Sequence, residues 1–250
     1  MATSLPEGWI EPEWPAHPRV RSFITTRAGG VSVGPYASFN LGDLTADDPQ
    51  AVEENKRRLT QLLPAPPRWL RQVHGARIVR ADDIAGVVEA DASYTRNPAV
   101  VCAVKIADCM PVLLSDRDGT CVGIAHAGWR GLASGVIEHT VHALGARPES
   151  LIAYLGPAIG PEAFEVGDDV CTAFCQRDAE AQTAFRPLRE GKWLADLFML
   201  ARRRLTRCGV ERIYGGSLCT YSDPARFYSH RRNPVTGRMA ACIWLDAGGH

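Results

Sequence analysis

Long stretches of chain separate the three residues that most restrict how this protein can fold, His74, Cys109 and His126. Each adjoins a glycine or the end of an apolar run. Zinc fingers hold their ligands on short local loops, and no such loop can contain these three. Only a folded core can bring them together. Two imidazoles and one thiolate would leave a tetrahedral Zn²⁺ one open position, which is typical of catalytic zinc and predicts an enzyme with an activated water.

The charge balance argues against a polyanionic partner. The 250 residues include 28 basic and 28 acidic side chains, so no net field attracts nucleic acid or an anionic membrane, and we expect neither as a partner. No positively charged start followed by an apolar stretch marks a secretory signal. The longest uncharged apolar run, 99–104, is too short to span a bilayer. We therefore expect a cytoplasmic protein with reduced cysteines.

Hydrophobic patterning predicts many short strands and fewer helices in one domain. No linker, charge block or repeat divides residues 1–250. Apolar periodicity predicts helices over 132–144, 168–177 and 194–208. Strands outnumber helices without strict alternation, which favours an α+β fold of mixed sheets flanked by helices. The predicted strands, several of them rich in valine and isoleucine, span 20–26, 76–81, 99–106, 112–115, 121–125, 151–155, 213–218, 227–230 and 240–245.

Taken singly, the candidate ligands also have ordinary structural interpretations. His74 lies in a turn before the strand predicted at 76–81, where a histidine commonly forms local hydrogen bonds. Cys109 follows an apolar strand, a position that suits a small buried hydrophobic residue. His126 ends a strand and faces a glycine-rich turn and a helix start, which suits a metal or an anion. Arg130 in that turn adds a forked donor for phosphate or carboxylate.

Together, the segments 72–75, 106–114 and 125–131 resemble one family, the YfiH-type or laccase-domain proteins, once called multicopper polyphenol oxidases. The resemblance covers nearly the whole chain. It implies a mixed-sheet fold similar to the catalytic domain of cytotoxic necrotizing factor, with zinc bound by the residues that match His74, Cys109 and His126. Further matching segments lie at 25–32, 40–42, 155–161, 164–167 and 236–240.

The resemblance also implies a reaction. Members of the family cleave adenosine, inosine, guanosine and methylthioadenosine with inorganic phosphate to the base and a ribose 1-phosphate, and they deaminate adenosine. Two departures from the family pattern affect the expected substrate choice. Ile106 stands where many members have threonine, and Asn233 ends a segment that many members end with aspartate. We expect a monomer that binds a purine nucleoside and phosphate.

Four further side chains are candidates for proton transfer or substrate contact. Asp108, beside Cys109, is the candidate proton carrier for deamination, and capping of a strand end is an equally open alternative. Arg27, Asn40 and Arg130 each lie in a glycine-rich turn, where they suit contacts with phosphate and ribose. For both arginines the alternative is an ordinary surface position.

Three other functions stay open. An amidase acting on a UDP-MurNAc-amino acid would use zinc, or Cys109 as a nucleophile activated by His126, and a bacterial branch of the family is linked to peptidoglycan precursor editing. A copper-dependent polyphenol oxidase is disfavoured because seven histidines cannot supply a full multicopper set and a blue site, although Cu²⁺ can replace Zn²⁺. A zinc-stabilised module without activity would need a fourth ligand such as Cys102 or Cys121.

Overall fold

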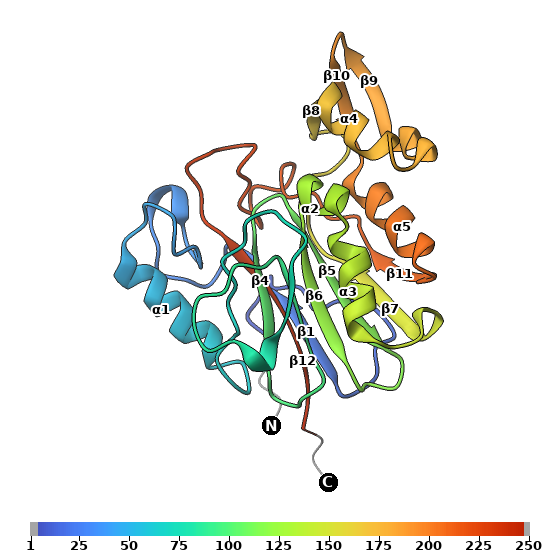
Figure 1. The fold of residues 1–250 in the computed structure, drawn as a ribbon. Helices are drawn as coiled ribbons and strands as arrows, with labels where there is room; N and C mark the ends of the chain where they lie inside the picture. The colour runs from blue at the N-terminus through green and yellow to red at the C-terminus, as the bar shows by residue number, and fades with distance from the viewer. Residues whose placement is uncertain (1–4, 248–250) are drawn as a thin grey trace.

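Three sheets form the core of residues 5–247, the part of the chain that the computed structural model describes. The strands are β1 (Val20–Ile24), β2 (Ile78–Arg80), β3 (Ala92–Thr95), β4 (Cys102–Ile106), β5 (Met110–Asp116), β6 (Val122–Ala127), β7 (Leu151–Leu155), β8 (Glu165–Gly167), β9 (Phe185–Arg189), β10 (Lys192–Ala195), β11 (Arg212–Gly215) and β12 (Met239–Leu245). The largest sheet has the order β11-β7-β5-β6-β3-β2. The sheet β1-β12-β4 packs on one of its faces, and β8-β10-β9 projects from the body of the molecule (Figure 1).

Helices cover the outer faces of the two main sheets (Figure 1). They are α1 (Pro49–Thr60), α2 (Trp129–Ser134), α3 (Val136–Leu144), α4 (Asp168–Cys175) and α5 (Leu197–Arg207). Helices α2 to α5 share a core with β5, β6 and β7, whereas α1 packs its buried Leu59 with residues of β1 and β12. Within residues 5–247, every helix is too short or too polar to pass through a bilayer.

This layering explains the apolar runs in the sequence. Every residue of β5 is buried, because helices cover one face of its sheet and the second sheet covers the other. The same holds for β12 in the smaller sheet. Strands buried on both faces read as continuous rather than alternating apolar segments. The predicted mixed-sheet α+β fold is confirmed.

The helix predicted over 132–144 is wrong as a single element. Two helices, α2 and α3, meet at Gly135, whose φ of 94° is left-handed. Only glycine adopts this conformation without steric cost, so the residue ends one helix and starts the next. Helix α2 follows closely on β6, the strand that contains His126. The predictions over 168–177 and 194–208 are confirmed as α4 and α5 with slightly shorter bounds.

The strand predicted over 227–230 is also wrong. Phe227 and Tyr228 are buried, but they lie in a loop. Its backbone groups form hydrogen bonds within turns and with side chains, and not with a neighbouring strand. The Phe227 N–H donates to Asp223 O, and Phe227 O accepts from Arg232 Nη2. Helix α1, strand β3 and the β8-β10-β9 sheet were not predicted from the sequence. The start of α1 carried a signal, because Asp48 caps it and Pro49 opens it.

Candidate metal centre

The three expected ligands come together at one end of the large sheet. The candidate donor atoms of His74, Cys109 and His126 all lie within 4.8 Å of one another. His126 on β6 pairs with Pro111 on β5, so the turn before β5 brings Cys109 to the end of β6. His74, in the loop before β2, sets its ring edge-on to that of His126, with 5.0 Å between centroids. The sheet register therefore assembles ligands that are distant in sequence.

Unusual backbone geometry surrounds the cluster. His74 has a φ of 59° and Asp108 a φ of 91°, both positive although neither is glycine. Non-glycine residues in this region are uncommon and often mark functional sites. The next loop needs a glycine for a different reason. A Cβ on Gly128 would lie 2.6 Å from Cys109 Sγ, so the third segment of the site can approach the thiol only without a side chain.

Asp91 organises the centre and was missed by the sequence analysis. It is fully buried. Its oxygens accept the backbone N–H groups of Val73, His74 and Gly75 at 3.1, 2.9 and 2.7 Å. Oδ1 also accepts from His126 Nδ1 at 2.9 Å, which leaves Nε2 as the free nitrogen of that ring. One carboxylate thus fixes the loop of one ligand and the ring of another, as second-layer groups commonly do in metal sites. An isolated aspartate among alanines gave no pattern that indicated this role.

The electrostatics of the cluster suit a soft divalent metal. Burial opposes ionisation of the Cys109 thiol, but the charge and hydrogen bonds of His126 and His74 outweigh it and lower the pKa to about 6. Burial also opposes protonation of His126, but Cys109 and Asp91 raise its pKa to about 9. The metal-free pair is therefore a thiolate and an imidazolium near neutral pH. A thiolate between two imidazoles is a donor set that fits zinc.

The cluster opens into a cavity of about 990 Å³. Its walls combine aromatic surface from Trp69, Trp129 and Phe164 with several cationic side chains. Lys105 lies over the Trp69 ring at 4.7 Å, and Arg130 lies over the Trp129 ring at 4.4 Å. Apolar walls with a few polar groups are typical of sites for small organic ligands.

Asp108 lines the cavity, but both of its oxygens have partners in the protein. Oδ1 accepts from the Thr220 hydroxyl at 2.6 Å, and Oδ2 accepts from the Arg231 backbone N–H at 2.7 Å. Its carbonyl accepts from Ile159 N at 2.9 Å. These contacts favour the capping alternative, because they join three separate segments behind Cys109.

The structure separates the three predicted phosphate and ribose contacts. Arg130 is exposed and lines the cavity. Arg27 does not line it, because its guanidinium donates to Ala37 O at 2.7 Å and Pro224 O at 2.9 Å. Asn40 is fully buried, and its side chain bonds within the protein. Arg27 and Asn40 are thus held by hydrogen bonds within the neighbouring loops.

No fourth cysteine closes the cluster within residues 5–247. Cys102 lies inside β4, and burial raises the pKa of its thiol to about 12. Cys121 precedes β6 at the end remote from His126, and burial raises its pKa to about 11. Neither joins the group formed by His74, Cys109 and His126. A three-ligand centre leaves a coordination position open, as in catalytic zinc sites.

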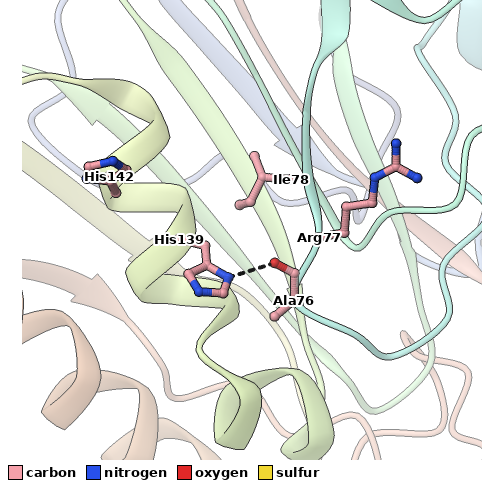
Figure 2. A pocket seen from close by; sticks show the side chains of 5 residues that line it. All are labelled: Ala76, Arg77, Ile78, His139 and His142. Atoms are coloured by element: carbon pink, nitrogen blue, oxygen red, sulfur yellow. Dashed lines mark hydrogen bonds between the residues drawn. The ribbon is translucent and has the colours of Figure 1, made fainter.

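A second cavity, of about 570 Å³, lies behind the His74 loop. Figure 2 shows His139 on α3 pointing to Ala76, whose carbonyl accepts from its Nδ1 at 2.9 Å. His142 points away from that contact (Figure 2). The bond attaches α3 to the chain just after Gly75. The residues around this cavity therefore hold the loop that contains His74 against α3.

Zinc affinity should rise with pH. Zinc needs His126 neutral and Cys109 ionised, so binding between pH 6 and 9 must displace the His126 proton. Affinity should increase about tenfold per pH unit over this range, fall more steeply below it and level off above it. Competition with a chromophoric chelator, corrected for the chelator's own protonation, measures this. A flat profile would show that His126 is already neutral in the metal-free protein.

Gly128→Ala should weaken zinc binding without unfolding the protein. The backbone of Gly128, with φ −75° and ψ 168°, accepts alanine. The new methyl group would displace Cys109 Sγ, at a cost of about 1–3 kcal/mol for overpacking. Gly86→Ala is the matched control, because Gly86 lines the same cavity and has no atom within 4 Å of an added Cβ. Equal zinc affinity of the two variants would contradict the expected crowding.

Comparison with known proteins identifies the family. Residues 21–246 match the family described as multi-copper polyphenol oxidoreductase laccase. A Pseudomonas aeruginosa protein named purine nucleoside phosphorylase is 54% identical over 239 residues, which cover 95% of this chain and 98% of that protein. Escherichia coli purine nucleoside phosphorylase YfiH is 50% identical, covering 94% and 98%. The crystal structure of a Neisseria meningitidis protein superposes with a TM-score of 0.95 at 48% identity, covering 96% of this chain and 100% of that one. This chain therefore belongs to the multi-copper polyphenol oxidoreductase laccase family, and its relatives in Pseudomonas aeruginosa and Escherichia coli are named purine nucleoside phosphorylases.

Proposed function

We propose that this protein is a zinc-dependent purine nucleoside phosphorylase. The observation that carries the proposal is the three-ligand cluster of His74, Cys109 and His126 beside a cavity of about 990 Å³. The names of the relatives support the reaction class. The substrates are adenosine, inosine, guanosine or methylthioadenosine, together with inorganic phosphate.

The cavity supplies what phosphorolysis requires of a protein. A phosphate oxygen bonds to C1′ of the ribose while the bond from C1′ to the base breaks, and the base leaves with the electron pair and takes up a proton. The sugar gains positive charge on the way, so an anion held against it is stabilising. Cationic side chains such as Arg130 hold phosphate, and aromatic walls such as Trp69 and Trp129 hold the base and exclude water. A zinc ion, when bound, supplies a Lewis acid.

Product analysis tests the proposal. Zinc-loaded protein is incubated with adenosine and, separately, inosine, with and without phosphate. Adenine and hypoxanthine should appear only with phosphate, each with an equal amount of ribose 1-phosphate. Absence of both bases despite stoichiometric zinc would contradict the proposal and favour the alternative amide substrate, a UDP-MurNAc-amino acid. Phosphate-independent oxidation of a polyphenol as the dominant activity would favour the oxidase.

We further infer adenosine deamination at the same centre. Its support is the open three-ligand set, which suits activation of water for attack at C6 of the purine. Inosine should form from adenosine without phosphate, and Cys109→Ala should abolish it. Asp108 stays the candidate proton carrier, although its hydrogen bonds favour a structural role. Undiminished deamination by Asp108→Asn would remove it from the reaction.

A single domain, a monomeric state and a cytoplasmic location stay predictions. All eight cysteines are free thiols, which is compatible with a reducing compartment. Light scattering on the zinc-loaded protein measures the molecular mass.

A further inference from the structure

The cationic side chains of the large cavity fall into two groups. Lys105 forms an ion pair with Asp43, and Arg71 pairs with Glu89 at 2.9 Å. Arg68, Arg130, Arg231 and Arg238 form no ion pair with any carboxylate in residues 5–247. Four guanidinium groups of the cavity wall are thus free of ion pairs within the described residues.

Arg238 differs from the other three because it is partly buried, whereas Arg68, Arg130 and Arg231 are exposed. Its Nη1 donates to Thr236 O at 2.8 Å and Gly237 O at 2.9 Å. Its Nε and Nη2 have no hydrogen-bond partner within the described part of the chain, so they are free to serve the cavity. Burial lowers the pKa of this guanidinium, and the charges of Asp108 and Cys109 act in the opposite direction.

The neighbouring loop holds Arg238 in place. Asn40 Oδ1 accepts from the Arg238 backbone N–H at 2.8 Å, and the Leu41 N–H donates to Arg238 O at 3.0 Å. A Cβ on Gly42 would lie 2.7 Å from Thr45 Cγ2 and 2.9 Å from Arg238 Cγ, so a side chain at this position would crowd the arginine stem. The segment 40–42 therefore positions the Arg238 side chain.

A partly buried guanidinium without a carboxylate partner is costly unless a ligand compensates it. Its free fork matches a tetrahedral oxyanion, to which arginine forms short charge-assisted hydrogen bonds. We propose that Arg238, fixed by Asn40 and Gly42, is the main phosphate-binding residue of the cavity beside the Cys109 centre. This assignment rests on the proposed phosphorolysis for its role in turnover, but phosphate binding is measurable without turnover.

The kinetic test uses zinc-loaded protein. In Arg238→Met the KM for phosphate should rise about tenfold or more, because charge-assisted hydrogen bonds are lost. The KM for the nucleoside and the zinc content should stay unchanged, and Arg238→Lys should recover part of the loss. Arg71→Met is the matched control, because Arg71 lines the same cavity but is paired with Glu89. If Arg238→Met fails to fold, Gly42→Ala displaces the arginine stem and should also raise the KM for phosphate.

Line broadening of inorganic phosphate in ³¹P NMR provides the second readout. Wild-type protein and Arg71→Met should broaden the signal, and Arg238→Met should not. Unaltered phosphate binding or phosphate KM in Arg238→Met overturns the assignment, and so does a rise confined to the nucleoside KM. If Arg238→Met does not fold, the same results in Gly42→Ala overturn it. Phosphate binding through Arg238 without base release would refute the proposed function and support the assignment. Phosphorolysis with an unchanged phosphate KM in Arg238→Met would support the proposed function and refute the assignment of Arg238.

Discussion

Replacing Cys109 by alanine removes the zinc and the phosphorolysis of adenosine together. The thiol is the only sulfur in the cluster, and the two histidines that remain cannot hold zinc in a three-ligand site. Changes to residues that only hydrogen-bond to a metal ligand typically lower activity by about 10–100-fold, and the loss in Cys109→Ala should be larger. Metal analysis after dialysis and a phosphate-dependent adenine assay measure the two effects on one sample.

Two further variants separate a ligand from a nucleophile. Cys109→Asp keeps a possible zinc ligand but removes the thiol, so it should retain part of the zinc and part of the activity. Cys208→Ala controls for loss of a thiol, because Cys208 ends α5 outside the cluster, and it should match the wild type. Full zinc content with no activity in Cys109→Asp would indicate covalent catalysis by Cys109 instead, as in the amidase alternative.

Asp91→Asn should be the next most damaging change. The carboxylate accepts three backbone N–H groups and His126 Nδ1, and an amide offers only one oxygen to these donors. Zinc affinity should fall by about 10–100-fold, as for other second-layer partners. Activity should fall with it and recover in part at high zinc concentration. Chelator competition and zinc titration of the phosphorolysis rate measure both effects.

Asp116→Asn is the matched control for a structural role. Asp116 is also a buried carboxylate that accepts backbone N–H groups, from Thr120 and Cys121. It lies at the opposite end of β5 from Cys109. Both variants should lower the melting temperature, but only Asp91→Asn should weaken zinc binding. Equal zinc affinity in the two would mean that Asp91 only stabilises the fold.

The fold could be predicted where burial leaves a local pattern. The apolar strands β4 to β7 and β12 and the amphipathic α5 are such elements. The short strands β8 to β10 carry exposed and charged residues, so their sequence resembles a loop. The buried loop at Phe227 resembles a strand, because its backbone partners are distant side chains such as Arg232. The apolar residues in the sequence indicate which segments are buried, but they do not indicate the hydrogen-bond partner of each backbone group.

The site divides in the same way. His74, Cys109 and His126 carry ligand chemistry in their own side chains, and a family resemblance points to all three. Asp91 and Arg238 owe their roles to what the fold places beside them. Asp91 lies beside the backbone of the His74 loop, and Arg238 lines the cavity and is held by Asn40. Arg27 and Asn40 show the converse, since their side chains form hydrogen bonds within the protein although both lie in glycine-rich turns.

Removal and return of the metal tests the central claim most directly. The protein is stripped with a chelator, and phosphate-dependent release of adenine and ribose 1-phosphate is followed while zinc is added back. We predict no phosphorolysis without metal and full activity at about one equivalent of zinc, with no recovery in Cys109→Ala. Undiminished phosphorolysis by the stripped protein would contradict the account, because the cluster of His74, Cys109 and His126 would then not be a catalytic metal centre.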